Sequence, residues 1–353
     1  MDKNKLKISG VIDADIKEIL SKLGEELFKL QGKRILITGA SGMLARYITL
    51  TLIQANRDIF KKPAQLYLVI RNKKEVFGKN RNIHYINADI SNSLPKLKNI
   101  NYIIHAASKA APKNYTVNML DTLNSNILGL YNLLALHSKN LESFLYFSSG
   151  EIYGNPENSK PIKEEYVGVI DHLNKRSCYI EGKRAGETIC MNYFWEKGLP
   201  VKIARIFHTF GPGLNIDDGR IFSDFIKNGL EGEDIHIMGD STIKRTILYI
   251  KDATIMFMLL LLSDRNGEVY NISNDSNIVS VREFAKIIRD EFNKYNKKKL
   301  KIKFDDKSKR EFYKDAVKVQ RPDIGKFKQD FKYVPKTSVE EAVSRTVASY
   351  LLK

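Results

Sequence analysis

Cysteine is scarce in this sequence, which has two, Cys178 and Cys190, among 353 residues. They have no metal-ligand spacing and suggest no disulfide framework, so we expect no metal site and a reducing compartment. Cys178, beside Tyr179, is most simply a small buried residue.

A long hydrophobic run is also missing. The longest, Ile255–Leu262, is far too short to cross a bilayer. The lysine-rich start, residues 1–9, is followed by no apolar segment of the signal-peptide type. The sequence therefore predicts a cytoplasmic protein with no membrane partner.

Acidic residues are in the minority: 41 Asp and Glu stand against 58 Lys and Arg, a formal net charge of +17. Such an excess raises the question of nucleic-acid binding, and the densest basic run lies at residues 297–303. The positive charge is nevertheless scattered over the chain, and no nucleic-acid motif is visible. We interpret the lysines as surface composition and expect no nucleic-acid partner.

The chain is long enough for about two domains, and 43% hydrophobic content allows a normal core. Apolar residues recur every three or four positions from Ile12 to Leu30, which predicts an amphipathic helix over residues 11–30. We expect this N-terminal arm, residues 1–31, to dock on the first domain. A role in oligomer contacts is the alternative.

The next segment has the order strand, glycine turn, helix. Arg34–Thr38 is a short strand of buried type, followed by Gly39-Ala40-Ser41-Gly42 and a helical run. The first glycine permits a tight turn, and Gly42 lets backbone N–H groups approach a pyrophosphate at the helix N-terminus. Ala45 allows the helix to pack closely on the strand. The pattern predicts a dinucleotide-binding α/β fold.

The ends of later strands carry candidate cofactor contacts. The second strand ends in Arg71, where many NAD-binding chains have an acidic residue for the adenosine ribose. An arginine there can accept the 2′-phosphate of NADP, or stack on adenine without that preference. The third strand delivers Asp89, and the fourth runs into Ala106 and Ala107, whose small side chains leave room for a cofactor.

A fifth strand delivers Ser149 and Glu151 to the carboxyl edge of the sheet, where parallel sheets bind ligands. After a loop, Tyr179 and Lys183 stand four residues apart on a predicted helix and share a face. An ammonium near a phenol favours the phenolate, so we expect Lys183 to lower the pKa of Tyr179. The alternative is a core tyrosine and a solvated lysine. With Ser149, the pair can converge on one alcohol.

These motifs, in this order, resemble the extended short-chain dehydrogenases/reductases that act on nucleotide sugars. The family pattern T-G-x-x-G-x-x-[GA] matches residues 38–45, H-A-A matches 105–107 and Y-x-x-x-K matches 179–183. The resemblance covers about residues 32–350. Longer strings are similar to the UDP-glucuronate decarboxylase branch at residues 176–179, 181–184, 204–207, 209–212, 218–220 and 321–324.

Three positions depart from that branch. Its T-S-E reads S-G-E at residues 149–151, its Asn before Thr-Phe-Gly-Pro is His208, and its late Arg is Gln320, with Arg321 one place along. Related 4,6-dehydratases pair a glutamate at this place with a preceding aspartate that protonates the leaving hydroxyl. Gly150 stands at the aspartate's place, which argues against dehydration.

The resemblance implies a Rossmann-type doubly wound parallel sheet in residues 32–207, with a returning segment at about 243–272. A smaller C-terminal α/β domain, residues 208–353, would bind the nucleotide sugar. The implied protein is a cytoplasmic NAD-dependent carboxy-lyase, with NADP possible because of Arg71. It would be a homodimer paired through the Tyr179 helix and a helix at residues 116–138. Polysaccharide assembly is the expected destination of the product.

The implied reaction oxidises C4 of a UDP-linked hexuronic acid, loses CO2 and reduces C4 again. In it, Tyr179 removes the C4 hydroxyl proton, Lys183 lowers the pKa of Tyr179 and Ser149 holds the oxygen. Glu151 is a further catalytic residue, and the alternative is an incidental charge of the loop. A 4-epimerase or a 4,6-dehydratase is the alternative, and a dinucleotide-sensing protein without turnover is a distant one.

Two sets of contacts follow from the resemblance. The expected cofactor contacts are Gly39, Ser41, Gly42, Met43, Leu44, Arg71, Asp89, Ile90, Ala106, Ala107, Asn126, Tyr179 and Lys183. The expected substrate contacts are Ser149, His208, Arg220, Arg245 and Arg321. Arg205 is either a further phosphate ligand or a buried structural residue, and Asp252 is expected to fix the domain junction.

Overall fold

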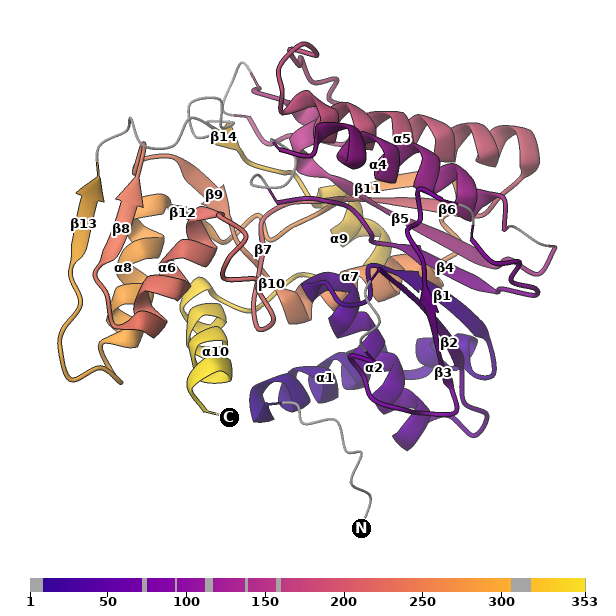
Figure 1. Ribbon diagram of the computed structural model, residues 1–353, viewed down its shortest axis with the longest axis horizontal. Helices are drawn as coiled ribbons and strands as arrows, with labels where there is room; N and C mark the ends of the chain where they lie inside the picture. The colour runs from indigo at the N-terminus through magenta and orange to yellow at the C-terminus, as the bar shows by residue number, and fades with distance from the viewer. Residues whose placement is uncertain are drawn as a thin grey trace.

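The computed structural model describes residues 9–71, 75–92, 94–111, 117–136, 139–156, 160–305 and 319–352. Within these residues, seven strands form one parallel sheet in the order β11-β6-β5-β4-β1-β2-β3 (Figure 1). The strands are β1 (Arg34–Thr38), β2 (Gln65–Ile70), β3 (Ile83–Asn87), β4 (Tyr102–His105), β5 (Ser143–Ser149), β6 (Val201–Ile206) and β11 (Glu268–Ile272). This confirms the doubly wound sheet.

Both faces of the sheet are covered by helices. In β1, Ile35 and Ile37 join one hydrophobic cluster and Leu36 joins the other, so the strand is apolar on both sides, as a buried parallel strand requires. Figure 1 shows α4 and α5 on one face and α1, α2 and α7 on the opposite face. Their bounds are α1 (Gly10–Leu23), α2 (Met43–Asp58), α4 (Met119–Leu134), α5 (Ser177–Lys197) and α7 (Ile250–Leu262).

None of the described helices has the combination of length and apolar character that a membrane-spanning helix needs. The helix expected over residues 116–138 is α4, which begins at Met119 and ends at Leu134. Residue 116 and residues 137–138 of that prediction lie outside the described residues.

The N-terminal arm differs from the single helix expected over residues 11–30. The Ser9 side chain caps α1 by accepting a hydrogen bond from the Ile12 amide, and the helix ends at Leu23. Gly24 has a φ of 51°, a left-handed backbone angle that stops the α-helix, and residues 24–30 continue as a 3-10 helix. The apolar face of the arm packs against α2, α7 and α10 and joins the main hydrophobic cluster.

A buried carboxylate anchors this arm. Asp15, with no exposed surface, accepts hydrogen bonds from Tyr47 of α2 at 2.9 Å, from the Tyr249 hydroxyl at 2.6 Å and from the Arg345 guanidinium at 2.6 Å. Arg345 belongs to α10 (Val339–Leu351), so one side chain joins the two ends of the chain. Burial raises the pKa of Asp15, and the three donors act against that rise.

Replacing Asp15 with alanine is expected to lower the free energy of unfolding by about 1–3 kcal/mol, because buried donors would lose their acceptor. Urea denaturation followed by circular dichroism measures the change. Glu25→Ala, at an exposed position of the same arm, is the matched control and should change stability by less than about 0.5 kcal/mol. Equal effects of the two substitutions would contradict the anchoring role of Asp15.

The second, smaller lobe lies beside the carboxyl edge of the large sheet. Its two short sheets have the orders β12-β9-β14 and β13-β8. The lobe contains α6 (Ile221–Glu231), β8 (Ile235–Met238), β9 (Lys244–Thr246), β12 (Ile278–Ser280), α8 (Val281–Phe292), β13 (Ile302–Asp305) and β14 (Val319–Gln320). Links to the large sheet are β7 (Thr209–Phe210), β10 (Leu248–Tyr249) and α9 (Gly325–Phe331).

The chain passes between the two lobes more than once. After β9 it returns to the large sheet as α7 and β11, which pairs with β6. Asp252, buried in α7, accepts hydrogen bonds from the Tyr333 hydroxyl at 2.8 Å and from the Thr337 amide at 2.9 Å. These bonds attach α7 to the segment before α10, and the role of Asp252 at a domain junction stays a prediction.

Candidate active site

The strand order of the large sheet reverses between β1 and β4, and parallel sheets of this kind bind ligands at such a point. The two strand ends are joined there, because the Thr38 hydroxyl lies 2.9 Å from Nδ1 of His105 and accepts a hydrogen bond from the Ala107 amide at 3.1 Å. Gly39 follows with a φ of 68°, and a Cβ added to it would lie 2.9 Å from the Ala107 backbone. Only glycine fits this turn.

A cavity of about 440 Å³ opens above this turn. Eight of the expected cofactor contacts line it: Gly39, Ser41, Gly42, Arg71, Asp89, Ile90, Ala106 and Ala107. Helix α2 begins at the cavity, and its N-cap, Gly42, has no side chain to occupy the first-turn amides. These amides and the close backbone approach fit the pyrophosphate of a dinucleotide.

Five expected cofactor contacts lie elsewhere, and two of them, Tyr179 and Lys183, line a neighbouring cavity. Met43 and Leu44 line that cavity too. Asn126 is fully buried, accepts a hydrogen bond from the Ser108 hydroxyl at 3.0 Å and donates one to the Thr122 carbonyl at 2.9 Å, so its amide supports the wall. Sequence reasoning missed Ser125, Lys109 and Asn215, which line the first cavity from three separate segments.

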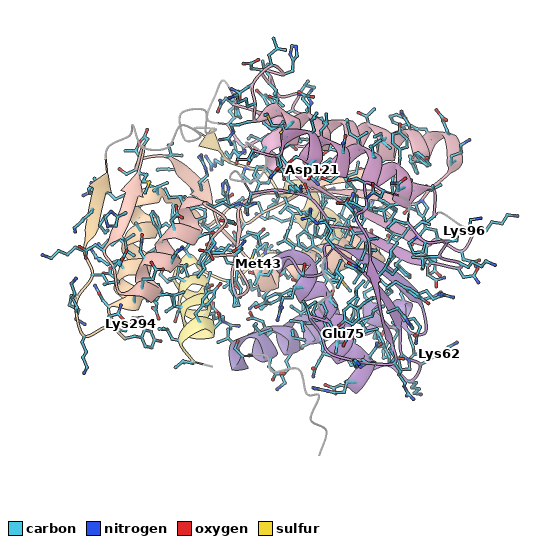
Figure 2. The ribbon with its side chains drawn as sticks, viewed as in Figure 1. Met43, Lys62, Glu75, Lys96, Asp121 and Lys294 are labelled. Carbon is cyan, nitrogen blue, oxygen red and sulfur yellow. The ribbon has the colours of Figure 1, made fainter. Side chains whose placement is uncertain are left out.

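The neighbouring cavity, of about 290 Å³, lies between the large sheet and the smaller lobe. Figure 2 places Met43, one of its lining residues, near the centre of the molecule, between the two lobes. The cavity brings together seven predicted catalytic and substrate-binding residues: Ser149, Glu151, Tyr179, Lys183, His208, Arg220 and Arg245. Residues from both lobes therefore share one site.

Tyr179 is nearly buried on α5, and its hydroxyl is hydrogen-bonded to Ser149. Burial raises the pKa of Tyr179 to about 12, and the negative charge of Glu151 adds to the rise, while Ser149 and the charge of Arg220 oppose it. The expectation that Lys183 would lower this pKa was wrong. Desolvation of the phenolate outweighs the opposing charge of Arg220.

Lys183 shares the helix face of Tyr179, but its ammonium turns to the neighbouring strand. Nζ donates a hydrogen bond to the Phe147 carbonyl at 2.7 Å and lies 5.0 Å from the centre of the Tyr146 ring. Burial lowers the pKa of Lys183 to about 7. Burial and the charge of Lys183 also lower the pKa of His105 to about 3, so this imidazole is neutral.

The loop at residues 150–154 follows β5 directly. Ser149 ends the strand, and its hydroxyl accepts a hydrogen bond from the Glu151 amide at 3.2 Å. A Cβ added to Gly150 would lie 2.6 Å from the Phe207 ring, so the aromatic ring fills the space that a side chain at position 150 would need. A polar group at this position requires Phe207 to move.

Glu151 lies between two other groups of the site. Its Oε2 atom is 3.6 Å from Nη2 of Arg176, is buried, and has no hydrogen bond within the described part of the chain. The negative charge of Glu151 adds to the rise in the pKa of Tyr179. Arg176 also lines the cavity, although sequence reasoning included it only in a string typical of the family.

His208 faces the cavity as a neutral ring. Burial and the charges of Arg245 and Arg220 lower its pKa to about 3, and its Nδ1 atom has no hydrogen-bond partner among the described residues. Arg220 donates to the Ala110 carbonyl at 2.7 Å. Burial lowers the pKa of Arg245 to about 10 against the opposing charge of Glu151. Two guanidinium groups and an imidazole thus surround a space that suits phosphate oxygens.

Two expected arginine contacts lie outside this space. Arg321 is exposed and does not line the cavity. Gln320, the last residue of β14, does line it, and Arg321 follows the end of that strand. The Gln320 amide donates to the Gly150 carbonyl at 3.3 Å. Arg205 is held by Glu187 at 2.7 Å, which confirms the structural alternative for that residue.

The NAD dependent epimerase/dehydratase family matches residues 35–273. This range includes the ends of the strands of the large sheet and helix α5, which carries Tyr179. The chain belongs to this family. NAD is its cofactor, and the first cavity fits that molecule by the glycine turn and the open helix end described above.

Curated relatives with similar sequences include UDP-glucuronic acid decarboxylase 6 of Arabidopsis thaliana, 33% identical over 65% of this chain, and UDP-glucuronic acid decarboxylase 1 of Xenopus tropicalis, 33% identical over 66%. The matches span 63% and 52% of the length of those two proteins.

Solved structures with the same fold include a UDP-glucose 4-epimerase from Thermotoga maritima with UDP-glucose, with a TM-score of 0.75 and 22% identity over 90% of this chain and 98% of that one. A UDP-glucuronic acid 4-epimerase from Bacillus cereus, in complex with NAD, has a TM-score of 0.75 and 21% identity over 91% of this chain and 100% of that one. At these sequence identities, the similarity shows a shared fold and nothing more specific.

Proposed function

We propose that this chain is an NAD-dependent decarboxylase of UDP-glucuronate. The observation that carries the proposal is the convergence of Ser149 and Tyr179 with arginines of the smaller lobe in one cavity, next to the dinucleotide cavity. The names of the curated relatives support the same reaction. Residues 32–207, with the returning segment 243–272, hold the cofactor, and residues 208–353 supply most contacts to the nucleotide.

The chemistry begins at the C4 hydroxyl of the sugar. NAD, when bound, supplies the acceptor for the C4 hydride and returns it at the end of the cycle. Tyr179 takes the hydroxyl proton, and its bond to Ser149 holds both oxygens beside the reacting atom. The charge of Arg220 favours the phenolate that this step needs.

Oxidation at C4 places the C5 carboxylate β to a ketone. The C5–CO2 bond can then break, with its electron pair passing to an enolate. The enolate oxygen lies where the C4 oxygen was, so the Tyr179 and Ser149 hydroxyls can donate hydrogen bonds to it. A proton from water is added at C5, and Tyr179 returns its proton to the C4 oxygen as the ketone is reduced.

The diphosphate of the substrate carries two negative charges, and we assign Arg220, Arg245 and His208 to it. The guanidinium groups offer fixed pairs of N–H donors that match phosphate oxygens. The neutral His208 ring offers a further hydrogen bond from a buried nitrogen that has none in the described protein.

A C4-epimerase acting on the same acid is the second candidate. Gln320 is a neutral amide bonded to the Gly150 carbonyl, so it adds no cation or acid beside the loop at residues 150–154. An epimerase site oxidises and reduces C4 and breaks no bond at C5, so it needs neither a cation nor an acid there. Gly150, packed against Phe207, likewise lacks the acid that a 4,6-dehydratase would use.

We further propose that the chain forms a homodimer through α4 and α5, which pack together on one face of the sheet. Large apolar side chains remain exposed on these two helices: Leu120, Leu128 and Tyr131 on α4 and Trp195 on α5. Pairing of α4 and α5 with their copies in a second subunit would bury these side chains.

Mass spectrometry of the purified protein with UDP-glucuronate and NAD tests the reaction. We expect the substrate to lose the mass of CO2 and to give a UDP-pentose. UDP-glucose, which differs by having no carboxylate, is the matched control and should lose no mass. Conversion of UDP-glucuronate to an isomer of equal mass would replace the decarboxylase by the epimerase, and no reaction of either sugar would reject both.

A further inference from the structure

The cavity beside Tyr179 contains more arginines than a diphosphate needs. Arg176, Arg220 and Arg245 line it from three different elements: the N-cap of α5, the N-cap of α6 and strand β9. The charges of Arg220 and Arg245 act on His208, and two guanidinium groups can balance the two charges of a diphosphate. Arg220 also acts on Tyr179, and Glu151 acts on Arg245, so charge alone does not separate the three arginines. The feature that points to a role for Arg176 at the sugar is its ion pair with Glu151.

Arg176 lies at the reacting end of the cavity. It precedes Tyr179 by three residues, so the two side chains leave the helix on neighbouring positions. Its Nη2 atom is 3.6 Å from the Glu151 carboxylate, which itself acts on the Tyr179 hydroxyl. The Arg176 side chain is 14% exposed, so its charge is poorly screened by solvent.

A sugar bound with C4 at Tyr179 places its C5 substituent within the same group of residues. A carboxylate there would approach the negative charge of Glu151. In a partly buried site two carboxylates repel each other strongly unless a cation lies between them. Gln320, on the strand that closes this part of the cavity, is neutral and is bonded to the Gly150 carbonyl.

We propose that Arg176 is the specificity-determining residue for an acidic sugar, holding the substrate carboxylate with one part of its guanidinium while Glu151 stays beside another part. The five N–H donors of a guanidinium can serve two carboxylates at once. The proposal rests on the function proposed above, because it requires that the sugar be oxidised at Tyr179. It deepens that function by assigning the charge of the sugar to one residue.

The test compares UDP-glucuronate, UDP-glucose and UDP, which share the nucleotide and differ in the sugar. Calorimetry in the presence of NAD, with Tyr179→Phe present throughout to stop turnover, measures their affinities for the protein and for Arg176→Gln. We expect the protein to bind UDP-glucuronate at least ~10-fold more tightly than UDP-glucose, and Arg176→Gln to weaken UDP-glucuronate ~30-fold or more by loss of a buried charge partner. UDP and UDP-glucose should change less than about threefold if Arg176 does not touch the diphosphate.

Two further variants complete the design. Arg289→Gln removes an arginine of α8 that is paired with Asp290 and does not line the cavity, so it should alter none of the three affinities. Arg176→Lys keeps the charge without the planar fork and should fall between the protein and Arg176→Gln for UDP-glucuronate alone. Retained UDP binding shows that each variant is folded.

The outcomes separate the two proposals. Equal weakening of all three ligands in Arg176→Gln would make Arg176 a phosphate ligand and overturn the inference. Equal affinities of the protein that keeps Arg176 for the acid and the neutral sugar would also overturn it. An Arg176-dependent preference for UDP-glucuronate, without release of CO2 by the protein that keeps Tyr179, would support the inference and reject decarboxylation.

Discussion

Tyr179→Phe is expected to reduce kcat on UDP-glucuronate by ~10²–10⁴-fold, the usual contribution of a positioned proton-transfer group. Phenylalanine keeps the ring that fills the nearly buried position on α5 and removes the hydroxyl bonded to Ser149. Affinities for NAD and UDP should stay within about twofold, since the guanidinium groups and the glycine turn are untouched. Initial rates and calorimetry measure the two effects separately.

The control for this substitution is Tyr295→Phe, at an exposed tyrosine that lines neither cavity described above. It loses a hydroxyl of the same kind and should retain full activity. If Tyr179→Phe kept more than a tenth of the activity, another group would have to transfer the C4 proton, and the proposed mechanism would be wrong.

Arg205→Met is expected to lower the free energy of unfolding by ~3–5 kcal/mol, because it leaves a buried carboxylate without its cation. Arg205 on β6 binds Glu187 of α5 through Nη2 at 2.7 Å, the Tyr153 hydroxyl at 2.7 Å and the Glu164 carbonyl at 2.6 Å. These bonds connect α5 and the loop after β5 to the sheet. Urea denaturation measures the loss.

Two comparisons sharpen this result. The double substitution Arg205→Met with Glu187→Leu removes both charges and should recover most of the loss, because no buried charge then stays unpaired. Arg289→Met, which breaks an exposed pair with Asp290, should cost about 1 kcal/mol or less. A loss of similar size in Arg205→Met and Arg289→Met would contradict the structural role of Arg205.

Local sequence patterns were sufficient for the framework of the site. The strand Arg34–Thr38 is apolar on both faces. The turn after it requires glycine at position 39, where a larger residue would not fit. Hydrophobic period and turn chemistry act over a few neighbouring residues, so they can be read directly. The same holds for Tyr179 and Lys183 on one helix and for Ser149 at a strand end.

The error in the N-terminal arm could have been avoided from the sequence, because the glycine that ends the helix was visible in it. The apolar pattern predicted one helix over residues 11–30, but Gly24 ends it with a left-handed backbone angle. A glycine inside a helical pattern is a possible end of the helix, and here that signal was correct.

The sequence by itself determined the doubly wound sheet, the glycine turn and the three residues Ser149, Tyr179 and Lys183 that meet at its edge. Only the tertiary structure decided the direction of the Tyr179 pKa, the turn of Lys183 toward Phe147 and the choice of Gln320 over Arg321 as the residue in the cavity. Burial and charge depend on side chains far apart in the chain. No local pattern records those distances.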